Sequence, residues 1–586
     1  MTSKASSFAG KCCHAPAARL GFSVMIGCSA ILMSHAAAKE VPVGSDQGDA
    51  RSHWSFRPVV SPPVPAPPNP SWARNPIDAF LAVQHAERGL IPQEPAPPHV
   101  LLRRVFMDLV GIPPTPEEVA DFTAQPTEER YLKVVEDLLA SPRYGERWGR
   151  HWMDVWRYSD WAGHNAEVRE SQPHIWRWRD WIIESTNADK PYDRMIHEML
   201  AADEIAPLDP DALRATGFLV RNWFRYNRNV WLENAVEHTG KAFLGLTLNC
   251  AKCHDHFYDP ILQTDFYRMR AFFEPHDIQT DLLSYEGAAA TNSLVRVFDA
   301  RPAEPTYLFT RGNEATPEKD KPMQPGFPAF LALTAPEIKE VPLPPQSYYP
   351  ALRADAVKDA LAKAEALALE SGKKEAAAWS AALALPAPEN VDSLRADADF
   401  ASRQASRDRT ALVALQQRIL AERQKYGITP GDPAPAARAA SAAERQAKLS
   451  AAEYAATEAE RQALPLRTAA AQGEAKAKEP LAEAEKKLTE AREALATARK
   501  ALTEESATYE PLGPVHPPIS TGRRLALARW ITDPQNPLTA RVAMNHVWMR
   551  HFGSPLVSSV FDFGKAGMAP RHPELLDWLA AEFMNQ

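Results

Sequence analysis

The residues best suited to chemistry lie in one short stretch, which reads Asn-Cys-Ala-Lys-Cys-His-Asp-His from Asn249 to His256. It contains Cys-x-x-Cys-His, the spacing that attaches a c-type haem. In such a site Cys250 and Cys253 bond the haem vinyl groups, and His254 ligates the iron from the same side. The sequence therefore predicts a haem c held by these three residues.

Three neighbouring residues are expected to support this site. His256 is too close to His254 in the chain to reach the opposite face of a haem easily. We therefore expect Asp255, His256 and Asp259 to orient His254 or to hold the loop.

The sixth iron ligand must come from another part of the chain. His151 is the first candidate, because it lies beside the Trp-rich face of a predicted helix that begins at Ser141. His164 and His238 are the next candidates. An open sixth position would instead permit small-molecule chemistry such as peroxide reduction.

Two other uses of the cysteines stay open. Cys250 and Cys253 could close a structural disulfide in an oxidising compartment. Together with His254 and His256 they also form a Cys₂His₂ set for a non-haem metal. Ligands so closely spaced on one loop rarely close a tetrahedron without a second element.

The start of the chain predicts export. Residues 1–38 have the pattern of a cleaved secretory signal: a basic first part, an apolar run from Leu20 to Met33, and Ala36-Ala37-Ala38 before the cleavage point. Lipoprotein processing at Cys28 is a minor alternative. No later apolar run is long enough to cross a membrane, so we expect no transmembrane segment after cleavage and a periplasmic or extracellular location.

Export also changes the cysteine count and the expected partners. Of the five cysteines, only those of the Cys-x-x-Cys-His motif remain after residues 1–38 are removed. The formal charge of −8 and the pI near 6.1 give no reason to expect nucleic acid as a partner.

Composition divides the 586 residues into segments of a mainly α protein. Seven prolines between Pro58 and Pro70 favour an extended spacer. Helix-start signals follow at Thr115-Pro116-Glu117-Glu118, at Thr127 and at Ser141-Pro142. We expect a Pro-rich spacer at 39–74, a multi-helix globular domain at 75–286, an irregular connector with some strand at 287–345, an inserted Ala-rich coiled coil at 346–508, and a small partial helical unit at 509–586.

A cluster of tryptophans lies between Trp148 and Trp181. It predicts either a heavy core or the walls of an apolar cofactor pocket. Aromatic residues beside carboxylates are also what a polysaccharide-cleaving cleft needs. The carboxylates that accompany the cluster are Asp154, Asp160, Glu167, Glu170 and Asp180.

Several motifs together resemble a known family. They are Asn75-Pro76-Ile77-Asp78, residues 111–118 (Gly-Ile-Pro-Pro-Thr-Pro-Glu-Glu), residues 141–148 (Ser-Pro-Arg-Tyr-Gly-Glu-Arg-Trp), Arg150-His151-Trp152, residues 189–193 (Asp-Lys-Pro-Tyr-Asp), and residues 250–256 with Asp259-Pro260. In this order they resemble the cytochrome-associated secreted proteins of planctomycetes that carry domain of unknown function 1549. Residues 523–530 and 572–578 resemble the start of its companion, domain of unknown function 1553.

The resemblance implies export and a link to haem or redox biology, and it supplies no established reaction. Many members carry a separate cytochrome c domain upstream, and this sequence has the Pro-rich spacer in its place. The companion domain stops at Gln586, which suggests a truncated or split gene.

Three functions follow from the sequence. The first is an exported, haem-bearing protein that transfers electrons or supports a redox partner protein. The second is a structural or interaction protein with a Cys250–Cys253 disulfide and a partner bound by the coiled coil. The third is an enzyme that acts on an extracellular polysaccharide.

Overall fold

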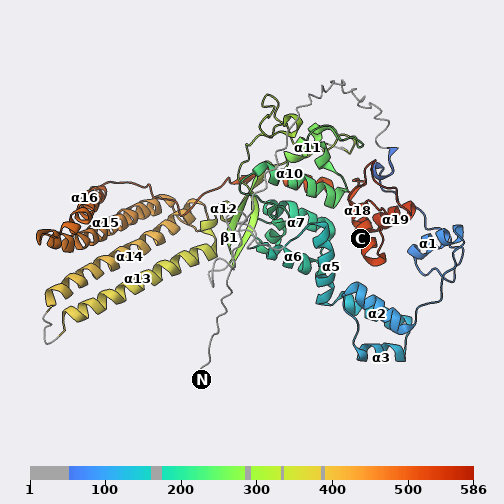
Figure 1. The fold of residues 1–586 in the computed structure, drawn as a ribbon, viewed down its shortest axis with the longest axis horizontal. Helices are drawn as coiled ribbons and strands as arrows, with labels where there is room; N and C mark the ends of the chain where they lie inside the picture. The colour runs from blue at the N-terminus through green and yellow to red at the C-terminus, as the bar shows by residue number, and fades with distance from the viewer. Residues whose placement is uncertain (1–51, 160–173, 284–291, 332–334, 385–389, 586) are drawn as a thin grey trace, which may run out of the picture. The chain divides into compact units, whose positions relative to one another are not determined.

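The computed structural model describes residues 52–159, 174–283, 292–331, 335–384 and 390–585 (Figure 1). Helix accounts for 61% and strand for 4%, which confirms the mainly α prediction. The predicted signal segment with Cys28, and His164, lie outside the described residues. Within the described part of the chain, no helix combines the length and the apolar character that a membrane crossing requires.

The first domain is built from short helices whose starts are set by local capping. Asn75, Thr115, Thr127 and Ser141 each accept a backbone N–H in the first helical turn, so the predicted starts are confirmed. The helices are α1 (Pro76–Glu87), α2 (Pro98–Leu109), α3 (Pro116–Ala124), α4 (Glu128–Leu139), α5 (Pro142–Val155), α6 (Trp176–Asn187), α7 (Tyr192–Ile205), α8 (Pro210–Leu213), α9 (Gly217–Val220), α10 (Arg228–Thr239) and α11 (Gln263–Arg270).

The expected helical domain at 75–286 ends in a strand instead. β1 (His276–Leu282) pairs antiparallel with β2 (Ser293–Asp299), in a register that places Ile278 opposite Val297. The strand expected within the connector at 287–345 is therefore confirmed at β2. The sequence predicts the residues of β1 as part of the helical domain, because their strand conformation depends on pairing with β2. The rest of the connector contains β3 (Val341–Pro342), which pairs with β4 (Ile519–Ser520), and the short helix α12 (Pro345–Tyr348).

The Ala-rich region forms four long helices that lie side by side (Figure 1). They are α13 (Ala354–Ala382), α14 (Val391–Lys425), α15 (Pro433–Ala471) and α16 (Lys478–Ala501). Neighbouring helices are antiparallel: Arg403 pairs with Glu453 and Arg461 with Asp397, so partners run in opposite order along α14 and α15. The helical arms are confirmed, and their coiled-coil character stays a prediction.

The C-terminal unit does not have a core of its own. It consists of α17 (Arg523–Ile531), α18 (Thr539–Phe552) and α19 (Pro573–Asn585). Its apolar residues Leu527, Val542 and Phe563 are fully buried in the same cluster as Trp181 and Phe243 of the first domain. The shared core explains how so short a unit can be stable.

Most of the described tryptophans of the cluster pack in or against this core. Trp156, Trp178 and Trp181 are at most 1% exposed. Of the carboxylates beside the cluster, Asp154 pairs with Arg150 and Asp180 with Arg179, while Asp160, Glu167 and Glu170 lie outside the described residues. The arrangement is a heavy core, which was one of the two expectations.

A buried group of charges also ties the C-terminal unit to the first domain. Arg524 of α17 forms ion pairs with Asp203 (2.6 Å) and with Asp299 (3.0 Å), and lies 3.4 Å from Glu204. We call these four residues the ionic hub. All are at most 4% exposed. Burial and the charges of Asp299 and Asp203 raise the pKa of Glu204 to about 8, although the charge of Arg524 lowers it.

Candidate functional site

The cysteine motif is positioned by a change of backbone form after α10. The helix continues as one π-helical turn (Gly240–Leu244), and Gly245 then adopts a left-handed conformation (φ 58°) that ends it. A 3₁₀ turn (Leu248–Ala251) carries the first cysteine. The segment that follows returns to the body at α11, so both ends of the motif are held by helices.

The two residues between the cysteines are held against the body, and the residues on either side of them are exposed. Ala251 is completely buried, and the ammonium of Lys252 lies 2.7 Å from a carboxylate oxygen of Glu233 on α10. Cys250, Cys253 and His254 are exposed, and both cysteines are free thiols. The two residues between the cysteines thus anchor the segment, while the three predicted haem-binding residues are accessible.

His256 forms hydrogen bonds that hold the loop closed. Its Nδ1 accepts hydrogen bonds from the backbone N–H groups of Tyr258 (3.2 Å) and Asp259 (2.9 Å). Its Nε2 lies 2.9 Å from the hydroxyl of Thr247. Because Nδ1 accepts these two hydrogen bonds, the ring hydrogen lies on Nε2, which donates a hydrogen bond to the hydroxyl of Thr247.

Asp255 fixes the other end of the loop. Its carboxylate accepts the backbone N–H of Gln263 at the start of α11 (2.8 Å). Gln263 in turn donates to the carbonyl of Lys252 (2.9 Å), and the Nδ1 of His254 lies 2.6 Å from the carbonyl of Asp255. These bonds fix the loop at both ends and at His254.

A glycine from the connector leaves room for the second cysteine. Gly312 has a left-handed conformation (φ 73°), and a methyl group there would lie 2.5 Å from the sulfur of Cys253. Phe309 of the same segment accepts a hydrogen bond from Gln263. The connector therefore borders the thiol closely, and only glycine fits beside it.

Asp259 joins the loop to the C-terminal unit. Its Oδ1 accepts the backbone N–H of Lys565 (2.6 Å), and a methyl group on Gly564 would overlap its carboxylate. Its Oδ2 has no hydrogen-bond donor and lies 3.7 Å from the Nε2 of His256. Burial raises the pKa of Asp259 against the effect of the Lys565 N–H and of His256.

The neighbouring backbone makes the same connection. The N–H of Phe563 donates to the carbonyl of Gly245 (2.7 Å), and its own carbonyl accepts the hydroxyl of Ser55 (2.6 Å) from the spacer. We call Asp259 with Phe563, Gly564 and Lys565 the backbone clasp, because its hydrogen bonds between the two domains use backbone groups of 563–565.

Two family models match the chain in the order that the resemblance implies. Residues 76–277 match PSCyt2, protein of unknown function (DUF1549), and residues 523–586 match PSD1, protein of unknown function (DUF1553). These two parts of the chain are similar to the two families. Comparison with curated proteins and with solved structures found no match.

The family boundaries place the site across both parts. The cysteine motif, His256 and Asp259 lie in the PSCyt2 match, whereas Gly564 and Lys565 lie in the PSD1 match. The PSD1 part therefore contributes directly to the support of the cysteine loop. This contact could not be predicted from the residue type at this position, because Lys565 acts through its backbone N–H.

The candidate sixth ligands lie elsewhere in the PSCyt2 part. His151 packs against Trp148, as its place on the helix predicted, and it borders a small space with His546 and Arg550 of α18. Burial lowers the pKa of His151 to about 4. Among the described residues, no contact joins His151 to the cysteine loop, so its role as a ligand stays a prediction that this geometry does not support.

His238 is buried in α10 at 6% exposure, and burial lowers its pKa to about 2, helped by the charge of Arg221. An imidazole this difficult to protonate is neutral and suits a core position. It lies outside the exposed group formed by Cys250, Cys253 and His254.

The exposed residues of the motif are of the types that covalent haem attachment requires. Within the described residues, no three His, Cys, Asp or Glu side chains form a metal-binding group. His256 is already committed to Thr247 and to the loop backbone, which removes it from the predicted Cys₂His₂ set. Two accessible thiols with an accessible imidazole remain, and these are the groups that a haem c attachment uses.

Proposed function

We propose that this is an exported protein that binds haem c through Cys250, Cys253 and His254 and transfers electrons or supports a redox partner protein. The observation that carries the proposal is the orientation of the motif. Ala251 and Lys252 face the body, while the two thiols and the imidazole are exposed on one anchored loop.

Exposure suits the attachment chemistry. On attachment, each thiol would add across one vinyl double bond of the haem, with a carbon–sulfur bond formed and the thiol hydrogen passed to the other vinyl carbon. Such an addition needs both sulfur atoms accessible at a fixed separation, which a loop anchored at Lys252 and Gln263 can maintain. Bound haem would supply one-electron chemistry.

The remaining residues of the site position these groups. His256 and Asp255 hold the loop, and Asp259 holds it against the C-terminal unit. His254 has one ring nitrogen near the carbonyl of Asp255, which leaves Nε2 for the iron.

Export is part of the proposal, since haem c attachment takes place outside the cytoplasm. It is supported by the signal-like sequence of residues 1–38 and by the confinement of the remaining cysteines to the motif. A lipid anchor at Cys28 is the minor variant of this location.

The test is expression in a host with haem c maturation machinery, followed by a visible spectrum and a denaturing haem stain of the exported protein. We expect covalent haem in the natural sequence and none in the double variant Cys250→Ala/Cys253→Ala. Tyr258→Phe is the matched control, because it changes an exposed side chain of the same loop and keeps the backbone hydrogen bond to His256.

A product without haem and two hydrogen atoms lighter than the dithiol would overturn the proposal in favour of the disulfide. The interaction-protein alternative would then lead, and its test is capture of a partner by the full chain but not by a variant that lacks residues 346–508.

A further inference from the structure

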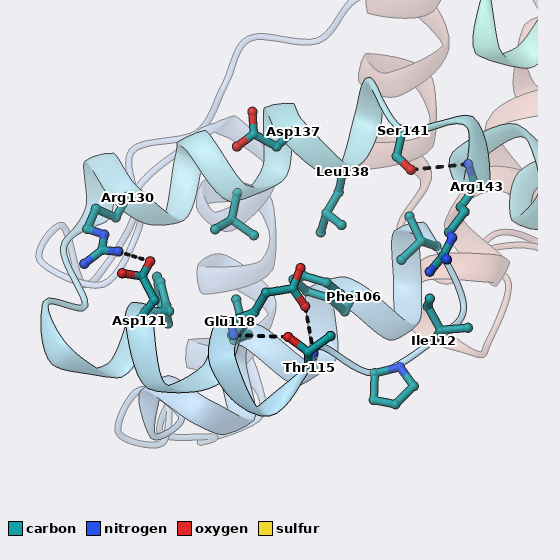
Figure 2. A pocket seen from close by; sticks show the side chains of 15 residues that line it. Phe106, Ile112, Thr115, Glu118, Asp121, Arg130, Asp137, Leu138, Ser141 and Arg143 are labelled. Atoms are coloured by element: carbon teal, nitrogen blue, oxygen red, sulfur yellow. Dashed lines mark hydrogen bonds and ion pairs between the residues drawn. The ribbon is translucent and has the colours of Figure 1, made fainter.

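A second feature of the first domain is a pocket between α2, α3 and α4, separate from the cysteine loop (Figure 2). Its volume is about 410 Å³, which is in the range of small-molecule sites. Its floor is apolar and includes Leu102 and Phe106 of α2 and Leu138 of α4. Two motifs noted in the sequence, residues 111–118 and 141–148, both contribute to its wall.

The pocket opens in a small core of its own. Leu102, Phe106, Phe122 and Leu138 belong to a cluster that is separate from the main core of the protein. Protein interiors are normally close-packed, so a small core that leaves this volume open loses contacts that its side chains could make. A ligand with an apolar body would restore them.

The carboxylates around the pocket already have partners. Asp121 pairs with Arg130 across the gap between α3 and α4 (Figure 2). Asp137 pairs with Lys133, whose ammonium lies 3.0 Å from each carboxylate oxygen. These ion pairs leave neither carboxylate as an isolated charge.

Glu118 is used in a capping box. Its carboxylate accepts the backbone N–H of Thr115 (2.7 Å), and it lies in the first turn of α3, where the helix dipole favours a negative charge. Its charge is thus partly balanced by the helix itself.

Arg143 is the exception among the charged residues of the wall. Its backbone N–H donates to Ser141, but its guanidinium has no ion-pair partner among the described residues. Figure 2 places it beside Ile112, which is 40% exposed at the pocket. The wall therefore offers one cation to a ligand, next to an apolar floor.

We propose that this pocket binds a small amphipathic monocarboxylate, with its apolar body over Phe106 and Leu138 and its carboxylate on the guanidinium of Arg143. The nearby paired carboxylates disfavour ligands with several negative charges, because these would face Glu118 and Asp137 as well. A planar guanidinium suits a carboxylate in particular, since it donates two parallel hydrogen bonds.

The test is isothermal titration of the full chain with decanoate and with 1-decanol, which have the same chain length and differ in charge. We expect decanoate to bind more tightly than decanol. Arg143→Gln should weaken decanoate binding about three- to tenfold, as expected for one solvent-accessible charged contact, and leave decanol unchanged. Arg104→Gln, an exposed arginine of α2 outside the pocket wall, is the matched control.

Ile112→Trp should block the opening and abolish binding of both compounds. Ile112 and Arg143 are both exposed, so these variants should fold, and a thermal melt checks this. Equal affinity for the two compounds, or full decanoate affinity in Arg143→Gln, would overturn the assignment of the anion to Arg143. Binding that survives Ile112→Trp, or no binding to the natural chain, would overturn the pocket as the site.

Discussion

The C-terminal unit is joined to the first domain by two buried contacts that differ in kind. In the ionic hub, Arg524 faces the carboxylates of Asp203, Glu204 and Asp299 and also donates to the carbonyl of Leu200 (3.0 Å). In the backbone clasp, Asp259 accepts one backbone N–H and keeps an oxygen without a donor. The hub concentrates charge away from the cysteine motif, whereas the clasp is part of the motif's own loop.

Because the two contacts differ in kind, substitutions in them should have different effects. A buried charge that loses its partner costs several kcal/mol, because it no longer has the attraction that offset its removal from water. A backbone hydrogen bond contributes less and mainly fixes position. We therefore expect the hub to control stability and the clasp to control the geometry of the cysteine loop.

The largest effect is expected for Arg524→Met. It leaves three buried carboxylates without their cation, and the free energy of unfolding should fall by about 3–5 kcal/mol. Urea unfolding followed by tryptophan fluorescence measures this. Arg529→Met, an exposed arginine in the same helix, is the control and should change stability by no more than about 0.5 kcal/mol. Similar results for the two variants would remove the distinction between hub and clasp.

The hub should also respond to pH through Glu204. Its pKa is about 8 in the folded protein and near 4.5 when unfolded, so the folded state holds the extra proton between these values. Stability contributed by this group is therefore complete below about pH 4.5 and is lost as pH rises to about 8, by up to about 1.4 kcal/mol per unit.

Glu204→Gln removes this titration. The difference in unfolding free energy between variant and natural protein should move in favour of the variant from pH 5.5 to pH 8. Taking the difference cancels the buried histidines, which titrate in both proteins. A difference that is constant with pH would show that Glu204 is ionised throughout.

The clasp is tested by Gly564→Ala, whose methyl group would overlap the carboxylate of Asp259. We expect a loss of about 1–3 kcal/mol, as for other overpacked sites. We also expect changed alkylation rates of Cys250 and Cys253 by iodoacetamide, read by mass spectrometry. Gly513→Ala has space for its methyl group and should change neither quantity. Unchanged thiol reactivity in a destabilised Gly564→Ala would make the clasp a purely structural contact.

The smallest effect is expected for Ser55→Ala. It removes the hydroxyl that donates to Phe563, at a cost of about 0.5–1.5 kcal/mol. The carbonyl keeps a second neighbour, since the Nε2 of His53 lies 3.3 Å away. A shift in the thermal midpoint measures the loss, with Ser52→Ala at an exposed position as control. A loss as large as that of Arg524→Met would contradict the ranking.

Local features of this fold could be predicted from the sequence. Thr115 and Ser141 cap helices through atoms within three residues of themselves, so their signals are complete in a short window. The exposure of Cys250 and Cys253 agrees with a motif that binds through its side chains. The support from His256 was also predictable, because its partners lie in the same loop.

Contacts between distant residues could not be predicted. Asp203 and Glu204 lie near the end of α7, after a kink at Ala201, and nothing near them in the sequence indicates a partner at Arg524. The role of Asp259 depends on a backbone N–H at Lys565, which any residue type would provide. β1 was missed for the same reason, because its pairing with β2 decides its conformation.

The four Ala-rich helices leave and re-enter the body at one place. The N–H of Leu512 donates to the hydroxyl of Tyr349 (2.6 Å), and the N–H of His516 donates to the carbonyl of Tyr348 (2.8 Å). A segment with adjoining ends can be lengthened, shortened or exchanged without moving either contact between the domains. The length of these helices is therefore independent of the geometry of the cysteine loop.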